Sequence, residues 1–332
     1  MGDLRAGLVG YGQMGRHHAR VLDALDGVEL VAIAEPVPED GVPERFVDDV
    51  DALIRRGVDL AVVAVPTALH ESVGLRLAEA GVHALIEKPV AADVASSLRL
   101  AEAFESAGLV GCVGHIERYN PALQEMRRRL ENGELGEVFQ VATRRQGPYP
   151  VRVEDVGVVL DLATHDVDLT AWVTQQEYAD LSARTAHRSG RDREDLVAAV
   201  GRLTDGAVVS HLVNWLSPLK ERVTMVLGER GCFTADTLSA DLTFHANGVA
   251  PVQWDSLASF RGVVQGDMTR YAIAKPEPLA VELAAFRDAV RGISNGVVPI
   301  RQAAKVVGVA EALLRSSVSA ETESLRDLDP SR

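Results

Sequence analysis

Three residues of this chain have the types and the spacing that oxidation of an alcohol requires. Lys88 lies in the string Glu87-Lys88-Pro89, at the end of the strand-like run 82–86, and His165 follows Asp161 by four positions. On a helix this spacing puts the carboxylate and the imidazole on one face, with their Cβ atoms about 5–6 Å apart. Because an imidazole has an ordinary pKa of about 6.5, His165 is suited to accept a hydroxyl proton near neutral pH. We therefore predict Lys88, Asp161 and His165 to be catalytic.

Each of these residues also has an ordinary structural interpretation. Glu87 and Lys88 could form an ion pair at a strand end, and Asp161 and His165 could lie on a solvated face of a helix. Taken alone, each pattern favours that ordinary interpretation. Together with the motifs in the rest of the chain, however, the catalytic interpretation is favoured.

A dinucleotide-binding fingerprint stands at the amino end, in Gly10-Tyr11-Gly12-Gln13-Met14-Gly15. It follows the apolar run 6–9 and precedes the helix-like run 17–25, which is the strand–turn–helix context that gives such a motif weight. Glycines are needed there because side chains would block the tight turn and the approach of backbone N–H groups to a pyrophosphate. We predict Gly10, Gly12, Gln13, Met14 and Gly15 to bind the cofactor.

An acid at the end of the second predicted strand favours NAD over NADP. Glu35 lies 20 residues past Gly15, where a carboxylate can accept a hydrogen bond from the adenosine ribose. The residues that follow, Pro36-Val37-Pro38, offer no cation for a 2′-phosphate. The cofactor predicted from these residues is NAD.

Length and composition limit the class of protein. With 332 residues and 47% hydrophobic residues, the chain fits two domains with separate cores. A formal net charge of −14 argues against nucleic-acid and anionic-membrane partners, since both reward clustered cations. No apolar run reaches the roughly 18 residues of a membrane span, so a soluble cytoplasmic protein is expected. Cys112 and Cys232 are expected to be free thiols, and no metal site is predicted.

The order of predicted elements indicates an α/β protein in two parts. Residues 1–120 alternate strands (4–9, 29–34, 59–65, 82–86 and 109–114) with amphipathic helices, which predicts a parallel Rossmann sheet. Residues 121–332 form the second part. There, Val/Thr-rich segments and turn signals at 204–206, 228–231 and Asn247-Gly248 predict an α+β domain with a mainly antiparallel, open sheet. Helices at 278–291 and 300–317 are expected to pack back on the first domain.

At this point the chain resembles the Gfo/Idh/MocA oxidoreductase family. The resemblance is carried by the glycine turn, Pro66-Thr67-Ala68-Leu69-His70, Glu87-Lys88-Pro89, Gly157 with Asp161 and His165, and a tail that begins Glu277-Pro278. It implies cofactor contacts from Pro66, Thr67, His70, Glu87 and Lys88, although His70 could equally be an ordinary residue of a first helical turn. It also implies a substrate site between the domains and an open sheet that builds homodimers or homotetramers. The segment from Glu35 to Phe46 is shorter than the usual strand–helix–strand crossover, so a helix there is expected to be lost.

A narrower resemblance points to the UDP-N-acetylglucosamine 3-dehydrogenase branch. The strings 114–121, 144–150 and 152–157 are similar to those of that branch, in the same order. The resemblance implies substrate binding by Lys88, Asp161 and His165 together with Arg118, Tyr119, Arg145, Tyr149 and Arg152. Arginine suits a nucleotide diphosphate because its charge is permanent and its donors are planar. Arg144 and Arg145 must point to opposite faces of a strand, so at most one can reach the site, and a packing role for Arg118 and Tyr119 is about equally favoured.

Two classes of function follow from the sequence. The first is an NAD-dependent sugar dehydrogenase that oxidises a secondary hydroxyl, with C3 of UDP-N-acetylglucosamine preferred and other nucleotide sugars, free sugars or inositol as alternatives. The second is a non-catalytic sensor or scaffold that binds NAD(P), because fold alone does not decide function. The presence of Lys88, Asp161 and His165 favours the enzyme, with a small-molecule sugar as its partner.

Overall fold

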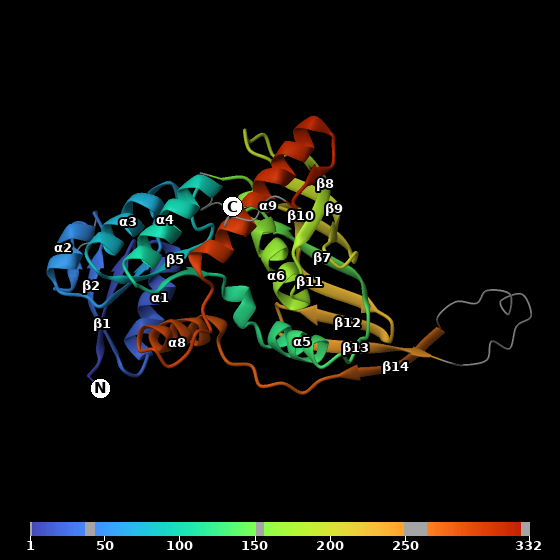
Figure 1. Cartoon of the computed structure of the whole chain (residues 1–332), viewed down its shortest axis with the longest axis horizontal. Helices are drawn as coiled ribbons and strands as arrows, with labels where there is room; N and C mark the ends of the chain where they lie inside the picture. The colour runs from blue at the N-terminus through green and yellow to red at the C-terminus, as the bar shows by residue number, and fades with distance from the viewer. Residues whose placement is uncertain (1, 37–43, 151–155, 249–263, 327–332) are drawn as a thin grey trace, which may run out of the picture.

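The structure is a computed structural model that describes residues 2–36, 44–150, 156–248 and 264–326. In these residues the strands form two sheets, one of six strands and one of nine. Figure 1 shows the two sheets side by side, with the helix α9 (Ile300–Ser319) running between them. Arg152, predicted to bind substrate, lies outside the described residues.

The first sheet is a parallel Rossmann sheet with the strand order β3-β2-β1-β4-β5-β6. From β1 the chain adds β2 and β3 on one side of the sheet and then β4, β5 and β6 on the other. The strand order therefore reverses between β1 and β4, the position at which folds of this kind bind their ligands. This confirms the predicted fold of the first part. The strands are β1 (Leu4–Val9), β2 (Val28–Ala34), β3 (Phe46–Val47), β4 (Leu60–Val63), β5 (His83–Glu87) and β6 (Gly111–Gly114).

Helices pack on both faces of this sheet, which explains why its strands are apolar on both sides. Ala61, Val62 and Val63 of β4 are all fully buried. The helices between the strands are α1 (Gln13–Ala24), α2 (Val50–Arg55), α3 (His70–Glu79) and α4 (Val94–Ser106).

The strand that follows β2 in the chain lies beside it at the edge of the sheet, and the expected loss of a helix before it stays a prediction. The strand β3 has only two residues and pairs with β2 in parallel, with Phe46 beside Ile33 and Val47 beside Ala34. Residues 37–43 lie outside the described residues. Tyr11 of the glycine turn packs edge-on against Phe46, with ring centroids 5.0 Å apart. This contact joins the shortened segment to the cofactor side of the sheet.

The second sheet is mainly antiparallel, as predicted, with the order β14-β13-β12-β11-β7-β10-β9-β8-β15. Among its described pairs only β10 and β7 run in parallel. Its strands are β7 (Val138–Pro148), β8 (Tyr178–Ala186), β9 (Leu196–Leu203), β10 (Val208–Asn214), β11 (Leu216–Gly228), β12 (Gly231–Asp236), β13 (Asp241–Gly248), β14 (Val264–Arg270) and β15 (Glu323–Ser324).

Two of the three predicted turns of this sheet are present. Gly206, with φ of +96°, lies in the turn between β9 and β10, and Gly231 follows the turn between β11 and β12. The prediction of a turn at Asn247-Gly248 is wrong. Both residues belong to β13 and pair with Gln265 and Val264 of β14. Because the strand continues through Gly248, the chain cannot reverse there.

One face of the nine-stranded sheet is covered and the other is open. Three helices lie on the covered face (Figure 1): α5 (Pro121–Glu131), α6 (Thr164–Thr174) and α9. Val141, Val209 and Val226 point from the sheet into the core under these helices. Val200 and Leu212 belong to the opposite face and are exposed. Alternation along each strand therefore produces one apolar face for the core and one free face.

The two C-terminal helices return to the first sheet. Leu279, Leu283 and Phe286 of α8 (Pro278–Val290) share a core with Leu8 of β1 and Leu22 of α1. The first turns of α9 bury Ile300 and Ala303 in the core of the Rossmann sheet, whereas its later turns pack on the other sheet. No helix among the described residues is both long and apolar enough to cross a membrane.

A buried histidine holds α6 against the second sheet. His211 of β10 lies 2.8 Å from Thr143 Oγ1 and 2.9 Å from the hydroxyl of Tyr178, each through one ring nitrogen. The Tyr178 hydroxyl in turn donates to the carbonyl of Val167 in α6, at 3.3 Å. Burial lowers the pKa of His211 to about 4. The imidazole is therefore neutral at neutral pH, and one of its ring nitrogens donates to a hydroxyl while the other accepts from one.

We predict that this histidine makes the fold sensitive to acid. Its pKa is lower in the folded than in the unfolded state, so its contribution is complete above about pH 6.5 and is lost as the pH falls toward 4. One pKa unit corresponds to about 1.4 kcal/mol, so the contribution is of the order of 3 kcal/mol. His211→Gln should show a smaller loss of unfolding free energy between pH 7 and pH 4.5 in denaturant titrations, and the exposed His187→Gln should match the unmodified protein. An equal loss in both variants would contradict the assignment.

Candidate active site

The glycine turn after β1 has the shape of a pyrophosphate cradle. Gly10 has φ of +93°, and a Cβ there would lie 2.6 Å from the carbonyl oxygen of Ala64. A Cβ on Gly15 would lie 2.1 Å from the carbonyl oxygen of Gly10, whereas the space around Gly12 is open. The helix α1 starts at Gln13, and Gly12 gives it no side-chain cap. Its first N–H groups are thus left for an anion, so these residues fit NAD.

Glu35 directly follows β2 and points toward the glycine turn. Its Oε2 accepts a hydrogen bond from the backbone N–H of Tyr11, at 2.7 Å. The side chain is only partly buried, so its second oxygen is free to meet a ribose hydroxyl. This geometry agrees with the sequence-based choice of NAD.

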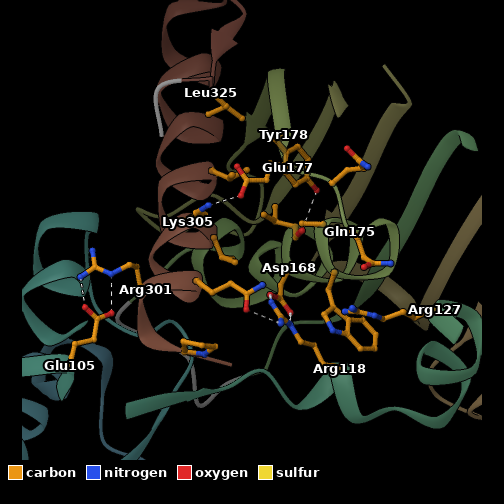
Figure 2. Close-up of a pocket in the computed structure, with 18 residues that line it drawn as sticks. Glu105, Arg118, Arg127, Asp168, Gln175, Glu177, Tyr178, Arg301, Lys305 and Leu325 are labelled. Carbon is orange, nitrogen blue, oxygen red and sulfur yellow. Dashed lines mark hydrogen bonds and ion pairs between the residues drawn. The ribbon is translucent and has the colours of Figure 1, made fainter. Parts of the chain in front are cut away.

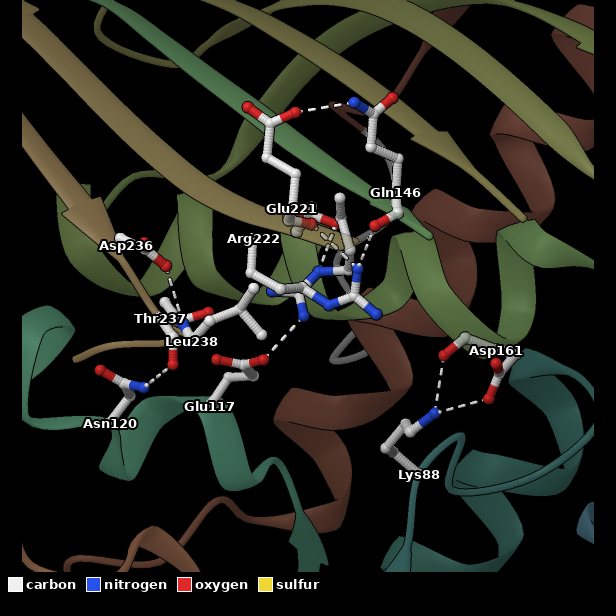
Figure 3. Close-up of polar contacts among 12 residues, drawn as sticks. Lys88, Glu117, Asn120, Gln146, Asp161, Glu221, Arg222, Asp236, Thr237 and Leu238 are labelled. Carbon is white, nitrogen blue, oxygen red and sulfur yellow. Dashed lines mark hydrogen bonds and ion pairs between the residues drawn. The ribbon is translucent and has the colours of Figure 1, made fainter. Parts of the chain in front are cut away.

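Lys88 and Asp161 meet across the two domains. The ammonium Nζ of Lys88 lies 2.9 Å from Asp161 Oδ1 and donates to the carbonyl oxygen of the same residue at 2.6 Å (Figure 3). The two side chains are 14% and 11% exposed, so the pair is largely shielded from solvent. An interaction between residues 73 positions apart thus brings together two of the three predicted catalytic groups.

Glu87 and His18 form a buried support for Lys88. His18 Nε2 lies 2.7 Å from Glu87 Oε1, and the other carboxylate oxygen accepts from the backbone N–H of Lys88 at 3.2 Å. Burial raises the pKa of the Glu87 carboxyl, but the hydrogen bond with His18 and the charge of Lys88 outweigh it and lower the pKa overall. No motif in the sequence pointed to His18 as a partner of Glu87.

His70 fixes the turn on the other side of Lys88. Its Nδ1 lies 2.9 Å from the carbonyl oxygen of Pro89, and its Nε2 lies 3.0 Å from that of Val65. Burial lowers the pKa of the His70 imidazole, and the two carbonyl contacts act in the opposite direction. His70 therefore ties the segment after β4 to the segment that carries Lys88. Pro66 and Thr67 stand beside it at the start of a short 3-10 helix (Thr67–Leu69), and their contact with the cofactor stays a prediction.

Asp161 lies in a π-helical turn (Val159–Ala163) that leads into α6. Glu194 holds the start of this turn, because its Oε1 accepts from the N–H of Val159 at 3.1 Å and its carbonyl accepts from Val158 at 3.0 Å. A Cβ on Gly157 would lie 2.0 Å from the Glu194 carboxylate, which explains the glycine before the turn. Such insertions in helices are frequent at functional sites. The predicted helix is present, with one turn widened.

His165 follows in the first turn of α6 and is left free for chemistry. Its Nδ1 is buried and has no hydrogen-bond partner among the described residues. No described hydrogen bond joins His165 to Asp161, whose carboxylate contacts Lys88 instead. Burial and the nearby charges of Lys88, Arg145 and Arg222 hold the pKa of His165 well below its usual value. The imidazole is therefore neutral, the form that accepts a proton.

Arg145 lies on the inner face of β7 and has two carboxylate partners. Its Nε donates to Asp166 at 2.8 Å and its Nη1 to Glu117 at 2.7 Å, and only 3% of the side chain is exposed. Arg144 points to the opposite face, where it pairs with Glu221. The expected alternation is thus present. Because the charge of Arg145 is already neutralised, a direct substrate contact through it stays a prediction that the geometry does not favour.

Arg118 and Tyr119, also predicted to bind substrate, have partners within the fold. Both belong to a short 3-10 helix (Ile116–Tyr119), in which Arg118 holds Asp168 through two hydrogen bonds and Tyr119 donates to the carbonyl of Gly296 at 3.0 Å. Arg118 also lines a separate cavity of about 690 Å³ between α6 and α9 (Figure 2). These contacts favour the packing role that the sequence left open.

Tyr149 follows β7 and is stacked with other side chains. Its ring packs edge-on against Trp215, with centroids 5.4 Å apart, and the guanidinium of Arg191 lies 4.1 Å from the ring centre. The predicted contact of Tyr149 with substrate stays a prediction.

Several further residues of the site carried no signal that sequence reasoning could use. His115 is buried, and its Nδ1 lies 3.4 Å from Asp168 Oδ2. Burial lowers the pKa of His115 to about 4, so the two residues do not form an ion pair at neutral pH. Asp166 and Asp168 belong to α6, and their arginine partners, Arg145 and Arg118, are distant in sequence. Cys112 and Cys232 are free thiols, and the described residues contain no cluster of side chains that could hold a metal ion.

Comparison with protein families agrees with the fold. A model of the GFO/IDH/MocA oxidoreductase family, NAD-binding Rossmann fold, matches residues 4–115. A model of the GFO/IDH/MocA C-terminal domain matches residues 123–234. Together the two models match more than half of the chain. The 3-10 helix that joins the sheets lies in the short interval between the two matched regions.

Individual relatives match over most of their length. Myo-inositol dehydrogenase Hyg17 of Streptomyces leeuwenhoekii is 30% identical, over 88% of this chain and 98% of its own. UDP-N-acetylglucosamine 3-dehydrogenase of Acidithiobacillus ferrooxidans is 27% identical, and its solved structure matches 96% of this chain and 99% of its own with a TM-score of 0.81. An oxidoreductase from Agrobacterium radiobacter, solved with NAD+, L-tartaric acid and magnesium, has the same fold, with a TM-score of 0.81 at 18% identity over 98% of this chain and 99% of its own.

The glycine cradle, the Lys88–Asp161 pair and the matched family models lead to one conclusion. The chain belongs to the Gfo/Idh/MocA oxidoreductase family and is an NAD-dependent enzyme.

Proposed function

We propose that this enzyme oxidises a secondary hydroxyl of a sugar, and that its substrate is a nucleotide sugar of the UDP-N-acetylhexosamine type, oxidised at C3 to the 3-keto sugar. The observation that carries the reaction type is the Lys88–Asp161 pair beside a neutral His165, at the carboxyl edge of the NAD-binding sheet. The substrate choice is supported by the match with UDP-N-acetylglucosamine 3-dehydrogenase over 96% of this chain.

The reaction divides between the cofactor and the side chains. Bound NAD supplies the acceptor for the hydride that leaves the carbinol carbon. His165 accepts the hydroxyl proton through Nε2, because its Nδ1 is buried. The alcohol thereby loses one hydride and one proton and becomes a ketone. The proton then passes from His165 to solvent.

Lys88 and Asp161 position the substrate and stabilise charge. The ammonium of Lys88 can stabilise the negative charge that develops on the substrate oxygen as the proton leaves. The Asp161 carboxylate holds that ammonium in place and can accept a hydrogen bond from a neighbouring hydroxyl. Since both groups are largely shielded from solvent, their charges act more strongly than they would in water.

A second candidate is an inositol dehydrogenase, which performs the same chemistry on an uncharged ring. It is favoured by the 30% identity to the myo-inositol dehydrogenase Hyg17 over nearly the whole of that protein. It is also consistent with the neutralisation of Arg145, the arginine that a nucleotide diphosphate was expected to engage. The two candidates differ in whether the substrate carries an anionic group.

The open face of the nine-stranded sheet supports a homo-oligomer. Val200, Val208 and Leu212 are exposed there, on the face that the described helices leave open. A second copy of the chain is the occupant that would bury them. A monomer in light scattering at micromolar concentration would contradict this proposal.

We predict that Glu35 sets the preference for NAD. A 2′-phosphate would meet its carboxylate as charge against charge, an effect of about 1–4 kcal/mol at contact distance. Glu35→Gln should therefore raise the ratio of kcat/KM with NADP to that with NAD by about 10-fold or more. Glu29→Gln, an exposed residue of the same strand, is the matched control and should leave the ratio unchanged. If the unmodified enzyme already prefers NADP, the ribose assignment is wrong.

We expect His165→Ala and Lys88→Ala each to lower kcat by about 10²–10⁴, the usual effect of losing a positioned proton acceptor or charge-stabilising group. Asp161→Asn should cost less, because an amide still accepts a hydrogen bond. NAD affinity, measured by calorimetry, should change little in all three variants. Wild-type turnover in His165→Ala would place the base elsewhere.

The pH profile gives a separate check on His165. Since its pKa is held below the usual value, the rate should rise with pH in a limb below about pH 6.5 and be flat above it. Lys88→Ala removes one of the charges that lower this pKa, so the limb should move to higher pH in that variant. An unmoved limb would mean that a group other than His165 titrates.

The substrate is tested by NADH absorbance with a panel of alcohols. If the nucleotide contributes charge-assisted hydrogen bonds, kcat/KM for UDP-N-acetylglucosamine should exceed that for free N-acetylglucosamine by about 100-fold or more. Myo-inositol serves as the substrate of the second candidate. Equal activity on the nucleotide sugar and the free sugar would rule out the first candidate.

A further inference from the structure

Arg222 is a cation in the site that no motif pointed to. It belongs to β11 and pairs across the sheet with Arg145 of β7. Its side chain is partly buried and reaches the same cluster as the catalytic groups, as its charge contributes to the lowered pKa of His165. Figure 3 shows its guanidinium between Glu117 and the Lys88–Asp161 pair.

The two neighbouring arginines differ in their partners. Arg145 is held between the carboxylates of Asp166 and Glu117. The Nη1 of Arg222 donates to two carbonyl oxygens, those of Gln146 and Glu221, both at 3.0 Å. No carboxylate of the described residues lies within ion-pair distance of Arg222. It is thus a guanidinium with a neutral set of partners, placed directly opposite another cation.

The charge of Arg222 has no direct counter-ion among the described residues. Burial first, and then the charge of Arg145, lowers the pKa of Arg222, although the more distant carboxylates of Asp166, Glu117 and Asp161 act in the opposite direction. A partly desolvated cation next to a like charge is costly unless an anion balances it. The guanidinium has five N–H donors in a planar fork, and its Nε and Nη2 donors have no protein acceptor among the described residues. Those donors have the geometry that a phosphate or a carboxylate requires.

We propose that Arg222 binds an anionic oxygen group of the substrate and thereby selects charged sugars over neutral ones. This inference rests on the proposed function, for which the group is a phosphate of the nucleotide sugar. A sugar acid offers the same chemistry through its carboxylate. In both cases the anion completes the charge balance of the inner face, and the ring is placed with its hydroxyl toward His165 and Lys88.

The test compares Arg222→Gln with a matched control. Arg230 also donates to a main-chain carbonyl, that of Gly133, but is exposed at the other end of the same hairpin. We expect Arg222→Gln to raise KM for UDP-N-acetylglucosamine about 10- to 100-fold, the usual effect of losing a charge-assisted hydrogen bond. Its kcat should change less than threefold, and Arg230→Gln should leave both constants unchanged. The KM for myo-inositol should be the same in all three proteins.

Competition by UDP, inorganic pyrophosphate and glucuronate separates the sources of the anion. Binding of the pyrophosphate group predicts inhibition by UDP and pyrophosphate, and binding of a sugar acid predicts inhibition by glucuronate, in each case weakened about 10-fold or more in Arg222→Gln. If UDP-N-acetylglucosamine is a good substrate and its KM is unaltered in Arg222→Gln, the inference is wrong while the proposed function stands. If a sugar acid reacts in place of UDP-N-acetylglucosamine and its KM rises in Arg222→Gln, the proposed substrate is wrong and the inference stands. If only neutral polyols react, both are wrong.

A second variant covers the case in which Arg222→Gln does not fold. Arg222→Lys keeps the charge but loses the planar fork, so it should fold with an unchanged thermal midpoint and show a KM between those of the wild type and the glutamine variant. No competition by any of the three anions in the wild-type enzyme would overturn the inference outright. Unchanged KM and inhibition constants in Arg222→Lys would do the same for the forked contact.

Discussion

The ion pair between Lys88 and Asp161 is the interaction on which the site depends. It joins the carboxyl end of β5 in one sheet to the π-helical turn before α6 on the other, so each domain supplies one half of the chemistry. Each half is held by its own buried group, Glu87 with His18 behind the lysine and Glu194 behind the aspartate. Removal of either partner would leave a shielded charge without compensation, which costs far more than the loss of a surface pair. The pair therefore fixes the relation of the two domains as well as the position of the reacting groups.

The charges around this pair explain how a histidine can act as a base at neutral pH. Lys88, Arg145 and Arg222 all disfavour a proton on His165, and burial acts in the same direction. Most of this positive charge is balanced within the protein, since Asp161 faces Lys88 and two carboxylates face Arg145. Arg222 differs, because its hydrogen bonds go to carbonyl oxygens and no carboxylate of the described residues lies at ion-pair distance from it. The same field that keeps His165 neutral thus favours negative charge on a bound substrate, both on the oxygen that loses its proton and on a more distant anionic group.

The sequence predicts local structure and the types of the reacting residues much better than it predicts which side chains contact one another in the fold. Apolar runs and glycine turns located the Rossmann strands, and the four-residue spacing put Asp161 and His165 on one helix, because these features depend on neighbours in the chain. Alternation correctly separated Arg144 from Arg145. It could not show that Arg145 is neutralised by Asp166 and Glu117, or that His18 supports Glu87 from 69 positions away, since ion pairs across a fold leave no periodic signal. The wrong turn at Asn247-Gly248 has a similar cause, because a strand partner overrides a local preference for turning.

The last two helices pack against the first sheet, so the two domains are held together by more than one segment of the chain. The helix α8 shares a core with β1 and α1, and α9 begins in the core of the first sheet and ends on the second. Together with the 3-10 helix at residues 116–119, these segments cross between the domains at separate places. A rotation of one domain against the other would have to break apolar packing along α9 as well as the Lys88–Asp161 pair. Because packed cores resist continuous deformation, the distance between Lys88, held on the cofactor side, and His165, held on the substrate side, is set by the fold. Specificity can then be changed through residues of the inner sheet face, such as Arg222, without moving the groups that react.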